Sequence, residues 1–121
     1  MGREFDRCDL KERTTAFAIQ VVHLYGSLPM KDRYDIQVAG KQIVRSETSV
    51  AANYREASRA RSKSDFISKI DICTQEADET LLWLEVLNKG CKLNLETIEP
   101  LKKEADELIS IFVTMSKRSK S

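Results

Sequence analysis

The chain is poor in the residues that cross-link a protein or interrupt its helices. Its 121 residues include only three cysteines, four glycines and two prolines. Cys8, Cys73 and Cys91 are odd in number and form no closely spaced pair, which argues against a disulfide framework or a zinc site. We therefore expect reduced, mostly buried thiols. With so few glycines and prolines, the chain favours long helices over many short strands.

Long hydrophobic runs are also missing. No stretch reaches the roughly 20 consecutive apolar residues that a membrane-spanning helix needs. Residues 1–11 are charged throughout, unlike a secretory signal. We therefore expect a cytoplasmic protein with no membrane partner. Apolar residues make up 41% and charged residues 32%, so the composition supports a hydrophobic core in a single domain covering residues 1–121.

Residue patterns that carry catalysis are scarce as well. His23 is the only histidine, and it lies between apolar neighbours. Glu76 and Glu79 stand one helical turn apart, but a di-metal bundle uses Glu-x-x-His pairs together with further glutamates. Cys73 falls on an apolar stripe, and no glycine-rich phosphate loop is present. The sequence therefore predicts a protein that is not an enzyme, with no metal site and no cofactor.

The dominant positive signal is a repeat of apolar residues. They alternate at intervals of three and four along four segments, at about residues 9–27, 32–60, 65–89 and 97–117. That spacing places them on one face of a helix, and an average repeat of 3.5 favours a left-handed bundle. The connections are short, which forces neighbouring helices to run antiparallel. We predict an all-α, up-down-up-down antiparallel left-handed four-helix bundle.

Local residues indicate where these helices begin and end. Asp9 followed by Glu12 fits a capping box at the first helix, and Ser64 is the predicted cap of the third. Gly90 stands where a left-handed terminating residue is expected after the third helix. Pro100 lacks a backbone N–H and should therefore lie in the first turn of the fourth helix.

The predicted core face of the second helix contains several small or polar residues. Its members are Ile36, Ala39, Ile43, Ser46, Val50, Asn53 and Ala57. A buried Asn53 amide needs partners, for which Glu76, Glu79 or Arg45 are candidates. We therefore predict a polar network in the core that fixes the register of the helices, formed by Ser46, Asn53, Glu76, Glu79 and Thr80. Gly40 indicates either a weak point in this helix or a tight crossing with a neighbour.

Charge is distributed unevenly along the chain. Residues 41–69 carry a net charge of +4, residues 70–108 carry −6 and residues 109–121 carry +3. In an up-down-up-down bundle, the turn between the second and third helices meets the end of the fourth helix. The cations expected at this end are Arg55, Arg59, Arg61, Lys63, Lys69, Lys117 and Arg118. They predict a surface for the phosphates of RNA or DNA. The alternative is a solvated end where cations compensate the negative helix termini.

The same charge segregation suits self-association, because a basic face of one copy can meet an acidic face of another. The fourth helix has more apolar residues than one core face needs, with Ile109, Ile111 and Val113 beside its main stripe. Trp83 has a similar position on the third helix. We predict that these four residues contact another subunit; the alternative is that they complete a wide intramolecular core.

The stretch from Thr48 to Ala57 reads TSVAANYREA, and Asp65-Phe66 and Glu76-Ala77 follow it. This ordered set resembles the four-helix-bundle proteins encoded in intervening sequences of bacterial 23S rRNA genes. It also resembles accessory proteins of diversity-generating retroelements. The resemblance implies a homopentamer, and for the retroelement relatives it implies nucleic acid and a reverse transcriptase as partners. We therefore expect a binding or scaffold module; the alternative is an assembly module that contacts proteins alone.

Overall fold

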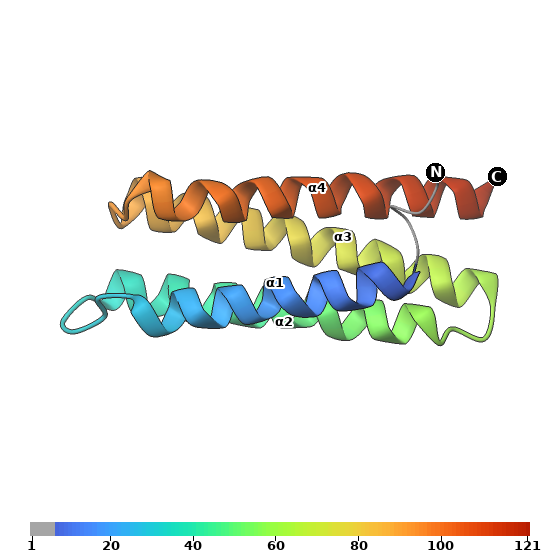
Figure 1. Ribbon diagram of the computed structural model, residues 1–121, viewed down its shortest axis with the longest axis horizontal. Coiled ribbons are helices and arrows are strands. Elements are labelled where there is room, and N and C mark those ends of the chain that lie inside the picture. The colour runs from blue at the N-terminus through green and yellow to red at the C-terminus, as the bar shows by residue number, and fades with distance from the viewer. Residues whose placement is uncertain (1–6) are drawn as a thin grey trace.

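The protein consists of four long helices. The computed structural model describes the backbone of residues 7–121 and the side chains of residues 10–121. The helices are α1 (Arg7–Ser27), α2 (Tyr34–Ser58), α3 (Lys63–Glu85) and α4 (Leu95–Lys120), and a π-helical turn, Val86–Gly90, continues α3. No strand occurs among these residues. Successive helices run in opposite directions (Figure 1), which confirms the predicted all-α, up-down-up-down bundle.

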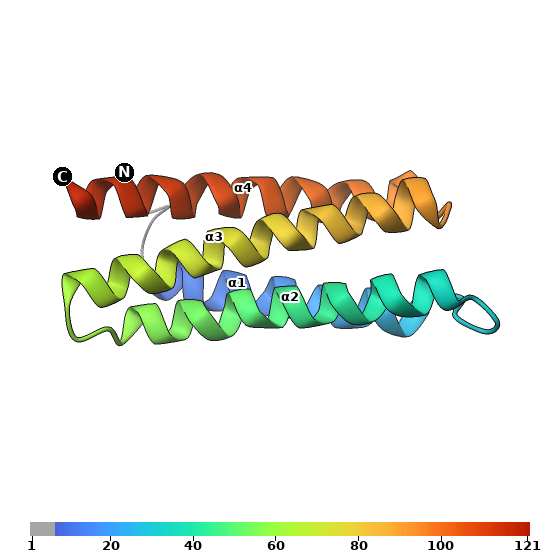
Figure 2. The same ribbon diagram turned by 180° about the vertical axis from the view of Figure 1, so that it is seen from behind.

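The helices pack in chain order, α1 along α2, α2 along α3 and α3 along α4. In Figure 1, α1 and α2 form the lower pair and α3 and α4 the upper pair, and Figure 2 shows the same arrangement from behind. The turn between α2 and α3 lies at the same end of the molecule as the C-terminal end of α4. The antiparallel order therefore brings segments distant in sequence to one end.

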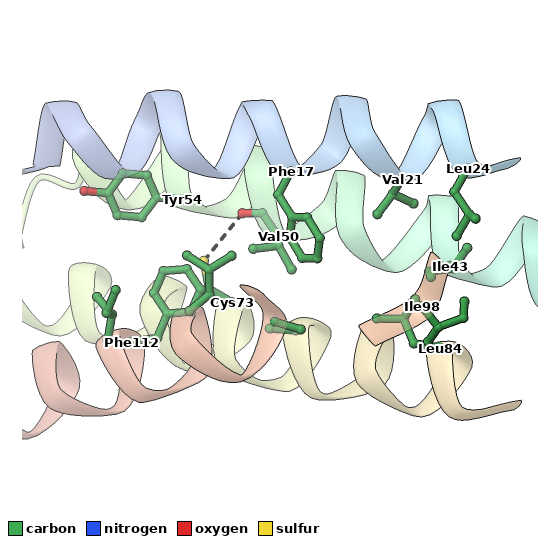
Figure 3. Packing of buried hydrophobic residues seen from close by; sticks show 14 of the residues in the cluster. Phe17, Val21, Leu24, Ile43, Val50, Tyr54, Cys73, Leu84, Ile98 and Phe112 are labelled. Atoms are coloured by element: carbon green, nitrogen blue, oxygen red, sulfur yellow. Dashed lines mark hydrogen bonds between the residues drawn. The ribbon is translucent and has the colours of Figure 1, made fainter. Parts of the chain in front are cut away.

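The core lies along the bundle axis and receives apolar side chains from every helix (Figure 3). The rings of Tyr54 on α2 and Phe112 on α4 stack with their centroids 6.3 Å apart. The thiol of Cys73 faces the Val50 carbonyl oxygen at 3.7 Å. Cys73 and Cys91 are free and buried, and the side chain of Cys8 lies outside the described part of the chain.

Two helix starts differ from the sequence prediction. The first helix begins at Arg7, so Asp9 lies inside it rather than at its cap. The cap of α3 is Ser62 and not Ser64, because the Ser62 hydroxyl accepts from the backbone N–H of Asp65 at 3.0 Å. Both serines precede the apolar stripe, and only the local chain path decides which of them reaches a free N–H.

The end of α3 and the start of α4 also differ from the prediction. Gly90 has no positive φ; Lys92, two residues later, takes the left-handed conformation with φ 68°. The extra π-helical turn carries the chain past Gly90 before it reverses. Asn94 caps α4 by accepting from the N–H of Glu96 at 2.7 Å, which places Pro100 beyond the first turn. Pro100 has no N–H to donate to the carbonyl oxygen of Glu96, four residues earlier. Both residues are exposed.

The predicted core face of α2 is correct in part. Gly40 marks a tight crossing, since a Cβ added to it would lie 2.9 Å from Leu28 Cδ1 and 3.0 Å from Tyr25 Cδ1. Tyr54 is fully buried, whereas its neighbour Asn53 is only half-buried. The intervals of three and four fit either residue, and the large ring gains more from burial than an amide does.

Candidate nucleic-acid interface

The predicted cations at the α2–α3 turn and at the end of α4 form a surface that we call the basic pole, comprising Arg55, Arg59, Arg61, Lys63, Lys69, Lys117 and Arg118. Ser119 near the end of α4 lines a cavity of about 390 Å³ together with Arg61, Ser62 and Lys63. This shared cavity places the last turn of α4 against the α2–α3 turn. Figure 1 shows both segments at the same end of the bundle.

Some of these cations are already engaged within the chain. The ammonium of Lys69 lies 2.6 Å from a carboxylate oxygen of Glu56, and this contact raises the pKa of Lys69. The guanidinium of Arg55 donates to the hydroxyl of Thr15 on α1 at 3.0 Å. These two residues therefore have less freedom to turn toward a ligand than the other members of the pole.

The remaining cations point outward. Arg59, Arg61, Lys63 and Lys117 are exposed, and none of them forms an ion pair with another residue that the structure describes. Arg118 is exposed too. Arg61 and Lys63 line the cavity itself. Four positive charges without an ion pair at one end of the bundle attract a polyanion, because each can exchange a mobile counterion for a phosphate.

The end of α4 is held in place by an acidic residue of α3. A carboxylate oxygen of Asp71 accepts from the Ser116 hydroxyl at 2.8 Å. The other oxygen of Asp71 lies 3.7 Å from the ammonium of Lys120. Asp71 thus ties the last turns of α4 to α3, which fixes the position of Lys117 relative to Arg61 and Lys63.

Other kinds of site lack support in the described residues. Within this part of the chain, no three His, Cys, Asp or Glu side chains gather in a way that could hold a metal ion. No helix between residues 7 and 121 is long and apolar enough to cross a membrane. His23 is exposed on α1.

Comparison with known proteins identifies the family. Residues 7–114 match the 23S rRNA-intervening sequence proteins. The chain belongs to this family. A crystal structure of a family relative from Bacteroides thetaiotaomicron, described as a protein of unknown function from the S23 ribosomal protein family, is similar over 88% of this chain and 97% of its own, with 35% identity and a TM-score of 0.79. No curated protein matches.

The family assignment agrees with the resemblance seen in the sequence and adds no enzymatic activity. The relative's description gives no reaction, ligand or assembly. The function of this family member must therefore be argued from its own surface.

The residues predicted to contact another subunit are less exposed than expected. Ile111 is 7% exposed and belongs to the core of its own chain, as the alternative interpretation predicted. Trp83, Ile109 and Val113 are half-buried. The indole N–H of Trp83 donates to a carboxylate oxygen of Glu79 at 3.3 Å. Ile111 is therefore not available for a contact between subunits.

A more exposed apolar surface lies on the other side of the molecule, along α1 and α2. Ile19 is 50% and Val22 46% exposed. Ile19 lines two adjoining cavities of about 470 and 360 Å³. Val22 lines the smaller one, whose wall also includes the small residues Ala51 and Ala52 of α2. We call this surface the α1–α2 groove. Sequence analysis missed it because Ile19 and Val22 lie off the main stripe of α1.

The predicted polar network divides into three separate groups. The hydroxyls of Ser46 and Thr80 lie 2.8 Å apart in the core. Glu76 and Glu79 pair instead with the Arg45 guanidinium near the surface, and this pairing lowers the pKa of Glu79. The Asn53 amide donates to the carbonyl and hydroxyl oxygens of Ser49, at 2.9 and 3.0 Å, within its own helix. Its predicted partners on the facing helix were therefore wrong.

The sequence interpretation also missed the most unusual side chain of the core, Glu47. It is 0% exposed, and neither carboxylate oxygen has a hydrogen-bond partner among the described residues. Burial raises its pKa to about 9, and the charge of Glu104 adds to the effect, while the nearby Thr80 hydroxyl opposes it. A signal was present, because Glu47 lies four residues after Ile43 and three before Val50.

Proposed function

We propose that this protein is a non-enzymatic binding module that associates with copies of itself and contacts the phosphate backbone of RNA or DNA through the basic pole. The observation that supports this function is the group of exposed cations at one end of the bundle, Arg59, Arg61, Lys63 and Lys117, which form no ion pair with another described residue. Such contacts bind phosphate and carry little sequence information. We expect affinity for several nucleic acids without strong sequence preference.

The experiment is a fluorescence anisotropy titration of short RNA and DNA duplexes and single strands at rising salt. The double variant Arg59→Glu/Arg61→Glu should lose most of the affinity, because it replaces two attractive contacts with repulsive ones. The matched control is Lys31→Glu/Lys89→Glu, which reverses two exposed lysines away from the pole. Equal loss in both variants would mean that net charge, and not the pole, governs binding.

Self-association through the α1–α2 groove is supported by a second observation. A single copy leaves Ile19 and Val22 about half exposed beside a wall of small residues that allows another helix to approach closely. The resemblance to pentameric proteins suggests five subunits. Light scattering should give a mass several times 13.8 kDa for the wild type. The variant Ile19→Asp/Val22→Asp should shift it toward a monomer, because it places charges in the contact.

The two parts of the proposal can be separated. If the Arg59→Glu/Arg61→Glu variant loses nucleic-acid binding but keeps the oligomer mass, the pole is a ligand surface. If it loses the oligomer instead, the charges serve contacts between subunits, and the protein is an assembly module for proteins alone. A wild type that binds neither RNA nor DNA at low salt contradicts the nucleic-acid function. Self-association is tested separately, by the mass from light scattering.

A further inference from the structure

The line where α1 meets α4 is the loosest side of the bundle. Each helix packs along its neighbour in the chain, but α1 and α4, the first and last helices, come close at hardly any position. A cavity of about 560 Å³ follows this line, and its walls include Gln20 and His23 of α1 and Thr97 and Leu101 of α4. We call this line the α1–α4 seam.

One cluster of charges bridges the seam. The guanidinium of Arg13 on α1 binds both carboxylate oxygens of Glu104 on α4, at 2.7 and 2.9 Å, and it also pairs with Glu107. Arg13 and Glu104 form part of the cavity wall. The bridge is partly open to solvent, with Arg13 and Glu104 side chains 30% and 26% exposed. It therefore closes the seam with polar contacts where apolar packing is thin.

Glu47 lies inside the bundle near this bridge. The groups that interact with it are Cys73 and Thr80 of α3 and Glu104 of α4, and Glu104 in turn binds Arg13 of α1. The Cys73 thiol is neutral, because burial raises its pKa to about 12. The charge that acts on Glu47 is the carboxylate of Glu104, which repels a second negative charge there.

We propose that Glu47 makes the α1–α4 seam a switch, in which the closed bundle requires the neutral acid and loss of its proton is coupled to separation of α1 from α4. A buried carboxylate with no donor is tolerated when protonated and strongly disfavoured when charged. Opening the seam gives the ionised group access to water. It also exposes core side chains of α1, among them Phe17, Val21 and Leu24 (Figure 3).

The test is hydrogen exchange of the whole protein, read by mass spectrometry at about pH 6 and about pH 8.5 and expressed as protection factors corrected for intrinsic exchange. In the wild type, protection of α1 should fall by up to about 200-fold at the higher pH, because opening releases one proton, while α3 stays protected. In Glu47→Gln, α1 should keep the same protection at both values. The matched control Glu76→Gln should behave as the wild type.

Three results would overturn the proposal. They are an unchanged α1 in the wild type, equal loss in α1 and α3, and a Glu47→Gln variant with the wild-type response. The second result means that the whole bundle unfolds and no separate seam opens. A further variant tests the bridge itself. Arg13→Gln should lower the protection of α1 at both pH values and keep the pH response, and unaltered protection in that variant would contradict the role of the bridge.

Discussion

At the scale of single residues, the buried carboxylate of Glu47 couples stability to pH. Its pKa is about 9 in the folded chain and 4.5 in an ordinary setting. Below pH 4.5, Glu47 is protonated in both the folded and the unfolded chain, so its burial does not make the free energy of unfolding depend on pH there. Between the two values the unfolded chain releases the proton and the folded chain keeps it, so the free energy of unfolding falls as pH rises, by at most about 1.4 kcal/mol per pH unit.

We therefore predict that Glu47→Gln stabilises the protein at about pH 8 and has little effect at about pH 5. Glutamine keeps the shape of the neutral acid and has no proton to lose in this range. Urea unfolding followed by circular dichroism at several pH values measures the effect. Glu76→Gln, which changes a surface ion pair with Arg45, serves as the control. A wild type whose unfolding free energy is flat between these pH values would refute the prediction.

Gly40 sets a second limit at this scale, because it allows α1 and α2 to cross closely. Gly40→Leu should lower the free energy of unfolding by about 1–3 kcal/mol, since the new side chain must displace Leu28 and the ring of Tyr25. Gly26 offers the matched position on α1, because an added Cβ meets nothing within 4 Å there. Gly26→Leu should cost clearly less in the same urea experiment. Equal losses would show that conformational preference, and not the crossing, matters.

The sequence predicted the position of single residues correctly where charged side chains are exposed and apolar side chains are buried. The exposed cations of the pole were predicted because lysine and arginine at helix ends rarely face the core. Glu47 and Tyr54 were missed for the opposite reason, since each breaks the usual relation between polarity and burial. Periodicity alone could not choose between Asn53 and Tyr54.

At the scale of helices, boundaries depend on caps that the sequence leaves ambiguous. Ser62 and Ser64 both precede α3, and only Ser62 accepts the N–H of Asp65. Ser62→Ala should lower the free energy of unfolding by about 1 kcal/mol, because it leaves that donor without its partner. Ser64→Ala should change it by less than about 0.5 kcal/mol. Thermal or urea unfolding of both variants measures the difference, and a larger effect at Ser64 would reverse the assignment.

The helices themselves were predictable, because four long segments keep an apolar interval of three and four. The π-helical turn Val86–Gly90 and the second-turn position of Pro100 were not. Both arise where the chain must reverse within a few residues, and there the geometry of the connection outweighs the preferences of single residues.

At the scale of the whole molecule, the antiparallel order decides which charges become neighbours. Arg59, Arg61 and Lys63 belong to one turn, and Lys117 joins them only because α4 returns to the same end (Figure 2). Four phosphate contacts predict that the logarithm of the binding constant falls with the logarithm of salt concentration with a slope of about −3. Arg59→Glu/Arg61→Glu should reduce that slope by about half or more. A slope near zero in the wild type would exclude a phosphate-binding pole.

The position of the last turn of α4 has a practical consequence for any protein fused to this one. A sequence joined after Ser121 emerges next to Ser119, and therefore beside Arg61 and Lys63. An acidic purification tag attached there would act as a tethered competitor for the cations. Affinity measured on such a fusion would be too low, and removing the tag should restore it.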